Sequence, residues 1–299
     1  AAFICTSRKP KSAPEQDLGI SFKGDDSCAG IYDHYLFGVK AYNDLPNNIK
    51  HVISKYRWLY QLGLQGPDMF FYNIPILRHR DYRNVGSYMH EHKVNAFFEC
   101  CLRRIGTIRS RQQQEEAISY LAGFINHYIA DSICHPYVYG RIGYPVDAPT
   151  SMHHGMHAHL ENELDAILLW KYKKEAVRIN QTATICLNGQ EIQFISHFLA
   201  SCINETYYPI TYRNNFQVTP AMVHRSIWAL RFGCRTLSDK NGKKKFGIAQ
   251  VESIFVNHPV ASAKMVTDSV TDYRSSCNLN HEAWGNPWDP TRVSTASFV

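Results

Sequence analysis

Apolar residues recur at the spacing of an amphipathic α-helix along most of the chain, and glycine or proline separates the segments. Pro46 and Pro136 end two of these segments, because proline cannot donate a backbone hydrogen bond within a helix. Asn47, Ser151 and Thr219 are the expected N-caps. The pattern predicts an all-α fold, a multi-helix bundle. Its predicted helices cover residues 30–45, 47–63, 86–104, 121–135, 153–174, 194–203, 220–232 and 259–273.

Other segments lack helical periodicity. Residues 1–29 are rich in Lys, Ser, Pro and Asp, which predicts a flexible leader before a single helical domain over residues 30–299. Gly66-Pro67 predicts a stiff turn, and Asn188-Gly189 predicts the turn of a small hairpin. We expect the basic stretch at residues 240–245 to be a surface connection, and the tail to be irregular.

Composition narrows the class of protein without identifying a function. With 44% hydrophobic residues the chain can form a substantial core, and it contains no apolar run long enough to cross a membrane. Its nine cysteines are scattered without a CxxC pair, which is typical of reduced thiols in the cytosol. We therefore expect a cytoplasmic protein, or a secreted one if a leader has been removed. The formal charge of +6 fits phosphate-bearing ligands but does not require them.

The segment at residues 121–135 carries polar residues at a regular interval. His127, Asp131 and His135 are spaced at i, i+4 and i+8. On an α-helix each step rotates by only about 40° and rises by about 6 Å, so all three side chains leave the same face. Apolar residues lie between them, and they predict that the helix packs in the core.

The segment at residues 153–174 repeats this arrangement. His157, Glu161 and Asp165 have the same spacing, with His153, His154 and His159 close by. Imidazole and carboxylate groups on a buried helical face suit zinc, and two such helices facing each other can form a multinuclear site. A single histidine of this kind is more often an ordinary core residue, but two matched sets make a metal site the stronger interpretation.

Three further candidate ligands come earlier in the chain. His34 lies at the start of the first helix, Asp68 follows the Gly66-Pro67 turn, and His90 begins the third predicted helix. Alternatives remain at this stage. His153, His154 and His159 compete with His157, and His79 and His92 compete with His90.

Taken together, these motifs resemble the zinc-dependent phospholipase C family, which is related to fungal zinc nucleases of single-stranded nucleic acids. The resemblance is carried by the sequences at residues 127–131, 135–136 and 157–165, with support from residues 34–38 and 66–68. It covers about residues 30–170, which would form the metal-site part, and residues 171–299 would add helices and a tail. It implies an all-helical bundle with two to three zinc ions between its helices.

The resemblance also implies ligand sets. One ion would be held by Asp68, His90, His127 and Asp131, and a second by His135, His157 and Glu161. A third would be held by His34 and a bridging Asp131, completed in the family by the N-terminal residue. The residues before His34 leave open whether processing creates that terminus or whether the third site is altered.

The leading hypothesis is a zinc-dependent phosphodiesterase of the phospholipase C type, in which metal-activated water attacks a phospholipid and Asp68 orients or deprotonates that water. The lysines of residues 240–245 could then contact anionic lipid. One alternative is a single-strand nuclease on the same metal site, with Tyr137, Tyr139 and Tyr144 as a platform for bases. The other is a non-catalytic, metal-stabilised helical binding protein.

Overall fold

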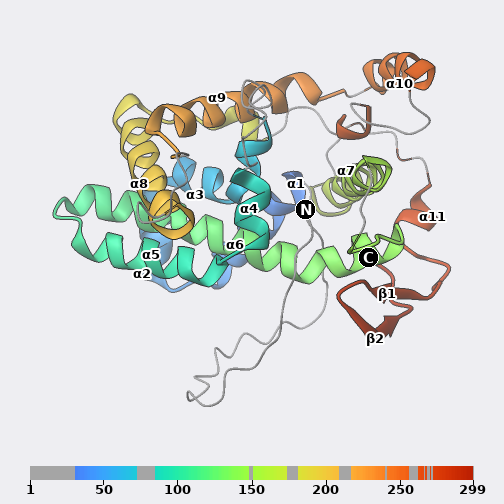
Figure 1. Cartoon of the computed structure of the whole chain (residues 1–299), viewed down its shortest axis with the longest axis horizontal. Helices are drawn as coiled ribbons and strands as arrows, with labels where there is room; N and C mark the ends of the chain where they lie inside the picture. Colours follow the sequence, from blue (N-terminus) through green and yellow to red (C-terminus); the bar gives the residue numbers. More distant parts are fainter. Residues whose placement is uncertain are drawn as a thin grey trace.

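Helices dominate the computed structural model, as the periodicity predicts, and they surround one long central helix (Figure 1). The predicted leader lies outside the described part of the chain, and the division into a leader and one domain stays a prediction. The structure describes residues 31–72, 85–147, 151–173, 181–208, 217–239, 241–255, 262–265, 267, 270 and 272–298.

The N-terminal helices are shorter than the sequence pattern predicts. α1 spans Ile31–Asp44 and α2 spans Asn47–Lys55. Asn47 is the first residue of α2 and Pro46 occupies the N-cap position, so the predicted Asn47 cap is wrong. The backbone turns at Tyr56 before α3, Arg57–Gly63. The expected turn after α3 is a 3-10 helix, η1, at Gly66–Tyr72.

The helix predicted over residues 86–104 is two helices. α4 covers Val85–Glu91 and α5 covers Val94–Thr107. Lys93 separates them with a φ of 49°, in the left-handed region, where a helix cannot continue. The interruption allows α4 to turn away from α5 toward the centre of the molecule.

α6 is the central helix and spans Arg111–Arg141, drawn in green along the length of the molecule in Figure 1. The prediction that Pro136 ends this helix is wrong. One proline costs a hydrogen bond and a steric adjustment, but α6 is held along its whole length by packing against α1, α2, α3, α5, α7, α8 and β1. That tertiary packing outweighs the local penalty.

The next two helices complete the main bundle. α7 covers Ser151–Lys173. A 3-10 helix, η3, at Gln181–Thr184 leads to α8, Gly189–Tyr207. The hairpin predicted at Asn188-Gly189 is wrong, because Asn188 caps α8 in a reciprocal capping box with Glu191.

The C-terminal part differs most from expectation. α9, Pro220–Leu237, begins at the predicted Thr219 cap, whereas α10, Lys243–Phe255, begins inside the predicted basic connection. The helix predicted over residues 259–273 is wrong in the described part of that range, where Met265, Thr267, Val270 and Asp272 lie outside any helix. The described elements there are the 3-10 helix η4, Ser262–Lys264, and the start of α11, Tyr273–Ser276. The tail is not wholly irregular, because β1, Trp284–Asn286, pairs antiparallel with β2, Asp289–Ser294.

Two hydrophobic clusters lie on either side of the middle of α6. The larger joins α3, α4, α5, α6, α8 and α9, and includes Leu59, Phe97 and Tyr120. The smaller joins α1, α6, α7 and the tail. Cys134 is buried in the smaller cluster, because its direction on the helix differs from that of the polar residues. Polar residues of α6 occupy the stretch between the two clusters, at His127, Asp131 and His135.

Candidate metal centre

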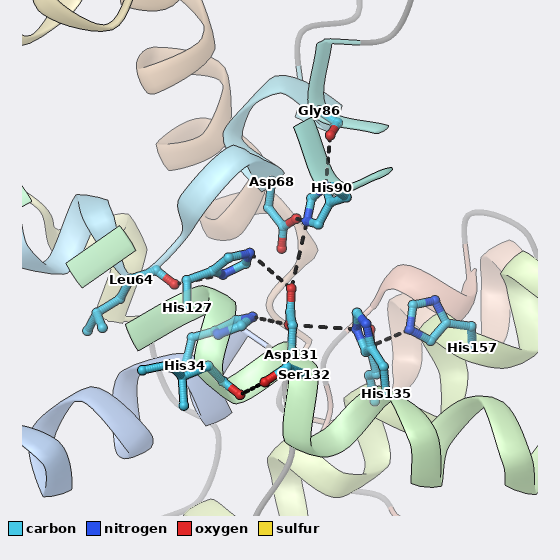
Figure 2. Close-up of polar contacts among 12 residues, drawn as sticks. His34, Leu64, Asp68, Gly86, His90, His127, Asp131, Ser132, His135 and His157 are labelled. Carbon is cyan, nitrogen blue, oxygen red and sulfur yellow. Dashed lines mark hydrogen bonds and ion pairs between the residues drawn. The ribbon is translucent and has the colours of Figure 1, made fainter. Parts of the chain in front are cut away.

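The polar face of α6 carries the centre of a buried cluster. His127, Asp131 and His135 are all buried, and they point from one side of the helix, as the i, i+4, i+8 spacing predicts (Figure 2). Asp131 lies in the middle, with imidazoles on both sides of it. Its carboxylate therefore links the groups that other elements bring to this point.

Four imidazole nitrogens approach the Asp131 carboxylate. His127 Nε2 lies 3.1 Å from Oδ2, and His34 Nε2 lies 3.4 Å from Oδ1. His135 Nε2 is 3.6 Å from Oδ1, and His90 Nε2 is 3.8 Å from Oδ2. Three of these four distances are longer than a normal N–H···O hydrogen bond. Most of these imidazoles therefore point at the Asp131 carboxylate without a direct hydrogen bond to it.

Close packing of α3 on α6 positions His127. A Cβ atom on Gly63 would lie 2.1 Å from the backbone oxygen of Tyr120, so the two helices approach at the glycine. The chain that leaves α3 brings the carbonyl oxygen of Leu64 to 3.1 Å from His127 Nδ1. Because a carbonyl oxygen only accepts, Nδ1 is the donor, and Nε2 is the nitrogen that faces the cluster.

Asp68 and His90 come from η1 and α4. His90 Nε2 lies 3.1 Å from Asp68 Oδ1, and His90 Nδ1 lies 2.8 Å from the carbonyl oxygen of Gly86 (Figure 2). The carbonyl fixes the tautomer of His90 in the same way as for His127. The side chain of Asp68 is 28% exposed, the largest exposed fraction among the predicted ligands in the cluster that face Asp131.

Gly66, at the start of η1, allows this approach. Its φ is +46°, and a Cβ atom there would lie 2.2 Å from His127 Cδ2. Any other residue would therefore meet both backbone strain and the imidazole ring. The sequence predicts Gly66 only as part of a turn, and the Gly-Pro-Asp motif is the signal that marks its role.

α1 contributes His34 from the opposite side. Its ring stacks on His127 with a centroid separation of 4.0 Å. The phenol of Tyr60 in α3 donates a hydrogen bond of 2.7 Å to the carbonyl oxygen of Gly38, one turn after His34. This bond holds α1 against α3, and α1 also packs on both α6 and α7.

α7 provides the last two predicted ligands. His157 Nε2 lies 2.6 Å from Glu161 Oε1, and His135 Nε2 lies 3.5 Å from the same oxygen. The ring of His157 stacks on Tyr139 at 4.4 Å between centroids. The facing helices α6 and α7 thus bring His135, His157 and Glu161 together, as the matched spacing predicts.

Burial and the neighbouring charged groups together set the pKa shifts of the imidazoles. Burial and the neighbouring His127 lower the pKa of His34 to about 3, and burial lowers that of His157 to about 3. Burial also acts to lower the pKa of His127, but the carboxylates of Asp131 and Asp68 outweigh it and raise that pKa to about 9. His34 and His157 are neutral at pH 7, so their lone pairs are available to a metal.

The carboxylates of the cluster respond to opposing effects. Burial acts to raise the pKa of Asp131, but the surrounding imidazoles of His127, His135 and His34 hold it well below its usual range. Burial raises the pKa of Glu161 to about 7, although His135 opposes the change. Asp131 is therefore an anion at neutral pH, and Glu161 becomes one when a nearby cation is present.

The donor atoms fit zinc. Three groups of residues have one ligand atom each within 4.8 Å of one another: His34, His127 and Asp131; Asp68, His90 and His127; and His135, His157 and Glu161. His34 Nδ1 is buried without a hydrogen-bond partner. His127 Nε2 faces the Asp131 carboxylate at 3.1 Å, and because the pKa of His127 is raised to about 9, this nitrogen holds a proton that a bound metal ion would replace. Neutral imidazoles and carboxylates are the ligands that zinc prefers.

This grouping differs slightly from the one that the resemblance implies. His127 belongs to two of the three groups, and Asp131 groups with His34 and His127. Asp165, the third residue of the α7 set, is fully buried but belongs to none of them. The assignment of individual residues to individual ions therefore stays a prediction.

The rival histidines in the described part of the chain lie elsewhere. His92 contacts Tyr88 and approaches Glu91. His159 approaches Glu163 at 3.5 Å. Rings of His153 and His154 lie beside Tyr144. His79 is outside the described residues, and the structure places His90 and His157 in the cluster.

The proposed base platform is not available at the surface. Tyr137, Tyr139 and Tyr144 are all buried. Tyr137 donates a hydrogen bond to the carbonyl oxygen of Ser276, and Tyr139 packs against Tyr144 and His157. These tyrosines support α6 and α7 and cannot stack on bases without unfolding their surroundings.

Comparison with known proteins gives one result. A family model described as zinc dependent phospholipase C matches residues 33–213. The match includes the polar cluster and extends beyond residue 170 through α8, further than the sequence motifs alone indicate. No curated protein and no solved structure matches the chain. Among the described residues, no helix is both long enough and apolar enough to cross a bilayer.

Proposed function

The chain belongs to the zinc-dependent phospholipase C family, a family of hydrolases, and we propose that it hydrolyses the phosphodiester of a phospholipid with water as the nucleophile. The products would be diacylglycerol and a phosphorylated head group. The observation that supports this proposal most is the continuity of the three donor groups: His127 is shared by two, and His135 links the third to Asp131.

Bound zinc would act as a Lewis acid toward the phosphate and would make a water molecule more acidic. The buried residues would hold the ions, with His34, His90, His127, His135 and His157 as neutral donors and Asp131 and Glu161 as anionic donors. The carbonyl oxygens of Leu64 and Gly86 would fix the orientation of His127 and His90.

Asp68 is the proposed catalytic residue as well as a ligand. Its side chain combines solvent access with contact to His90, so one oxygen can bind metal while the other accepts a proton from water. Burial acts to raise the pKa of Asp68, but the neighbouring imidazoles of His90 and His127 together outweigh it and lower that pKa, which keeps the carboxylate ionised at neutral pH. An ionised and accessible carboxylate at the edge of a buried metal cluster suits this role.

The test is hydrolysis of phosphatidylcholine and phosphatidylethanolamine by zinc-replete protein. We expect Asp68→Asn to lower kcat by about 10²-fold or more, the range typical for loss of a general base, while the protein keeps its zinc. Asp44→Asn is the matched control, because Asp44 is an exposed carboxylate at the end of α1. Full activity in Asp68→Asn would exclude the catalytic role.

The same preparation separates the other functions. Release of nucleotides from a single-stranded oligonucleotide, without phospholipid hydrolysis, would establish the nuclease. Bound zinc without turnover of either substrate would establish the non-catalytic protein. The burial of the three tyrosines favours the phospholipid.

A further inference from the structure

Large aromatic side chains stand on the outer face of α9. Trp228 and Phe232 are 61% and 54% exposed, and their rings stack with centroids 5.2 Å apart. They lie at i and i+4, so they form a ridge on one side of the helix. Arg225 and Arg235 are exposed near the two ends of this ridge.

α10 exposes large apolar residues to solvent. None of its residues is buried, and its exposed positions include Phe246, Val251, Ile254 and Phe255, each 57% to 79% exposed. Glu252, the one acidic residue of α10, instead accepts hydrogen bonds from Ser262. A helix that displays its large apolar residues to solvent and turns its carboxylate inward is unusual on a surface in contact with water alone.

The exposed charges of both helices have one sign. α9 contains no Asp or Glu, and α10 begins with Lys243 and Lys244, both exposed. Such a mixture of aromatic and basic residues is typical of helices that lie in the interface of a bilayer with anionic lipids. A second copy of the same face would bring like charges together, so charge complementarity disfavours self-association.

The same helices are attached to the metal centre. The inner side of α9 packs on η1, where a Cβ atom on Gly233 would lie 2.3 Å from the ring of Tyr72. η1 also carries Asp68. The start of α10 is joined to the end of α9, because Lys245 N donates to Asp239 Oδ2 at 2.7 Å and Lys244 Nζ donates to the carbonyl oxygen of Ser238. In Figure 1 both helices run along the same edge of the molecule.

We propose that the outer faces of α9 and α10 form a docking surface for a bilayer that contains anionic lipid. The aromatic and aliphatic side chains enter the interface, and Arg225, Arg235, Lys243 and Lys244 contact lipid phosphates. Docking needs no turnover. Docking would also bring lipid toward Asp68, because α9 packs on η1. This second part of the proposal rests on the proposed function, since it requires that the substrate is a phospholipid.

The experiment is co-sedimentation of the full, zinc-replete chain with vesicles of phosphatidylcholine, alone and mixed with phosphatidylserine, during a brief incubation at 4 °C that limits turnover. We expect stronger binding to the mixed vesicles and weakening at high salt. Phe246→Ser with Phe255→Ser should weaken partitioning by about tenfold or more, since each large apolar side chain would lose its contact with lipid. Trp228→Ala with Phe232→Ala should have a similar effect.

A second pair of variants separates the contribution of charge to vesicle binding from that of apolar contact. Lys243→Gln with Lys244→Gln should weaken binding to mixed vesicles by about 25-fold and leave binding to phosphatidylcholine nearly unchanged, at about fivefold for each lysine. Leu102→Ser in α5 is the matched control, because Leu102 is 58% exposed on another helix and should leave binding unchanged. All of these residues are exposed, so circular dichroism should show folded variants.

The outcomes distinguish docking from catalysis. Equal binding of wild type and the α9 and α10 variants would overturn the docking surface, as would concentration-dependent dimerisation that these variants abolish. Hydrolysis of a short-chain, monomeric phosphatidylcholine should be unchanged in the same variants. Failure of that reaction in the wild type would overturn the proposed function and would leave the vesicle-binding result intact.

Discussion

Gly66→Ala tests whether η1 and His127 are built to fit each other. An alanine Cβ at this position would lie 2.2 Å from His127 Cδ2 and 2.7 Å from Nε2, well inside van der Waals contact. The backbone has a φ of +46°, which costs a non-glycine residue about 1 to 2 kcal/mol. Displacing the ring or η1 adds about 1 to 3 kcal/mol, as in other overpacked sites.

Gly143→Ala is the matched control. Gly143 has a φ of +62°, but nothing lies within 4 Å of a Cβ atom there. Both variants carry the backbone strain, and only Gly66→Ala carries the steric conflict. By calorimetry we expect Tm to fall by about 2 °C for Gly143→Ala and by about 6 °C for Gly66→Ala.

Metal content gives the second readout of this comparison. Because His127 belongs to two donor groups, Gly66→Ala should lose at least one zinc ion per chain, whereas Gly143→Ala should keep the full complement. Equal Tm values together with equal zinc content in the two variants would show that the close approach of Gly66 to His127 has no part in forming the centre.

Three other perturbations follow from the packing and charge of the described residues. Gly63→Ala should destabilise the fold by about 3 kcal/mol in a urea titration, because its Cβ would meet the α6 backbone. Gly106→Ala is the control and should stabilise the fold by about 0.5 to 1 kcal/mol, since a Cβ there lies in open space on α5; the reverse order of stabilities would contradict the packing. Asn204→Ala should cost about 2 kcal/mol in the same titration, since Asn204 exchanges two 2.8 Å hydrogen bonds with the chain before α9, and an unchanged midpoint would refute it. Zinc affinity, measured by chelator competition, should rise by up to about tenfold per pH unit between about pH 6.5 and 8.5. Below its pKa of about 9, His127 holds a proton that zinc must displace, and an affinity that does not change with pH would count against His127 as a ligand.

The sequence predicts well which polar side chains come together in the cluster, because their spacing is periodic. The spacing of His127, Asp131 and His135 places them on one face whether or not the helix ends at Pro136, so the error at the proline does not affect them. The spacing of His157 and Glu161 works in the same way on α7. Residues on a regular helix can therefore be placed relative to one another without knowledge of the rest of the fold.

Features that depend on distant contacts are not accessible from the sequence in this way. The contacts of the Leu64 and Gly86 carbonyl oxygens with the imidazoles cannot be predicted, because every residue has a carbonyl oxygen. Gly66 can be identified from the sequence only as part of a turn. Asp165 has the periodic spacing of a ligand, but the position of α7 puts it outside the three donor groups. Helix α10 is not predicted because the run of lysines between Gly242 and Gly247 is typical of a surface connection, and because the helix has no apolar side that packs in the core.

The most direct test of the metal centre is zinc content by inductively coupled plasma mass spectrometry on wild type, His127→Ala and His51→Ala. His127 is buried in the cluster, and His51 is an exposed histidine on α2 that serves as the control. We expect two to three zinc ions per chain in wild type and in His51→Ala, and at least one fewer in His127→Ala. One zinc ion or none in metal-replete wild type, or equal content in all three proteins, would contradict a multinuclear centre built around His127.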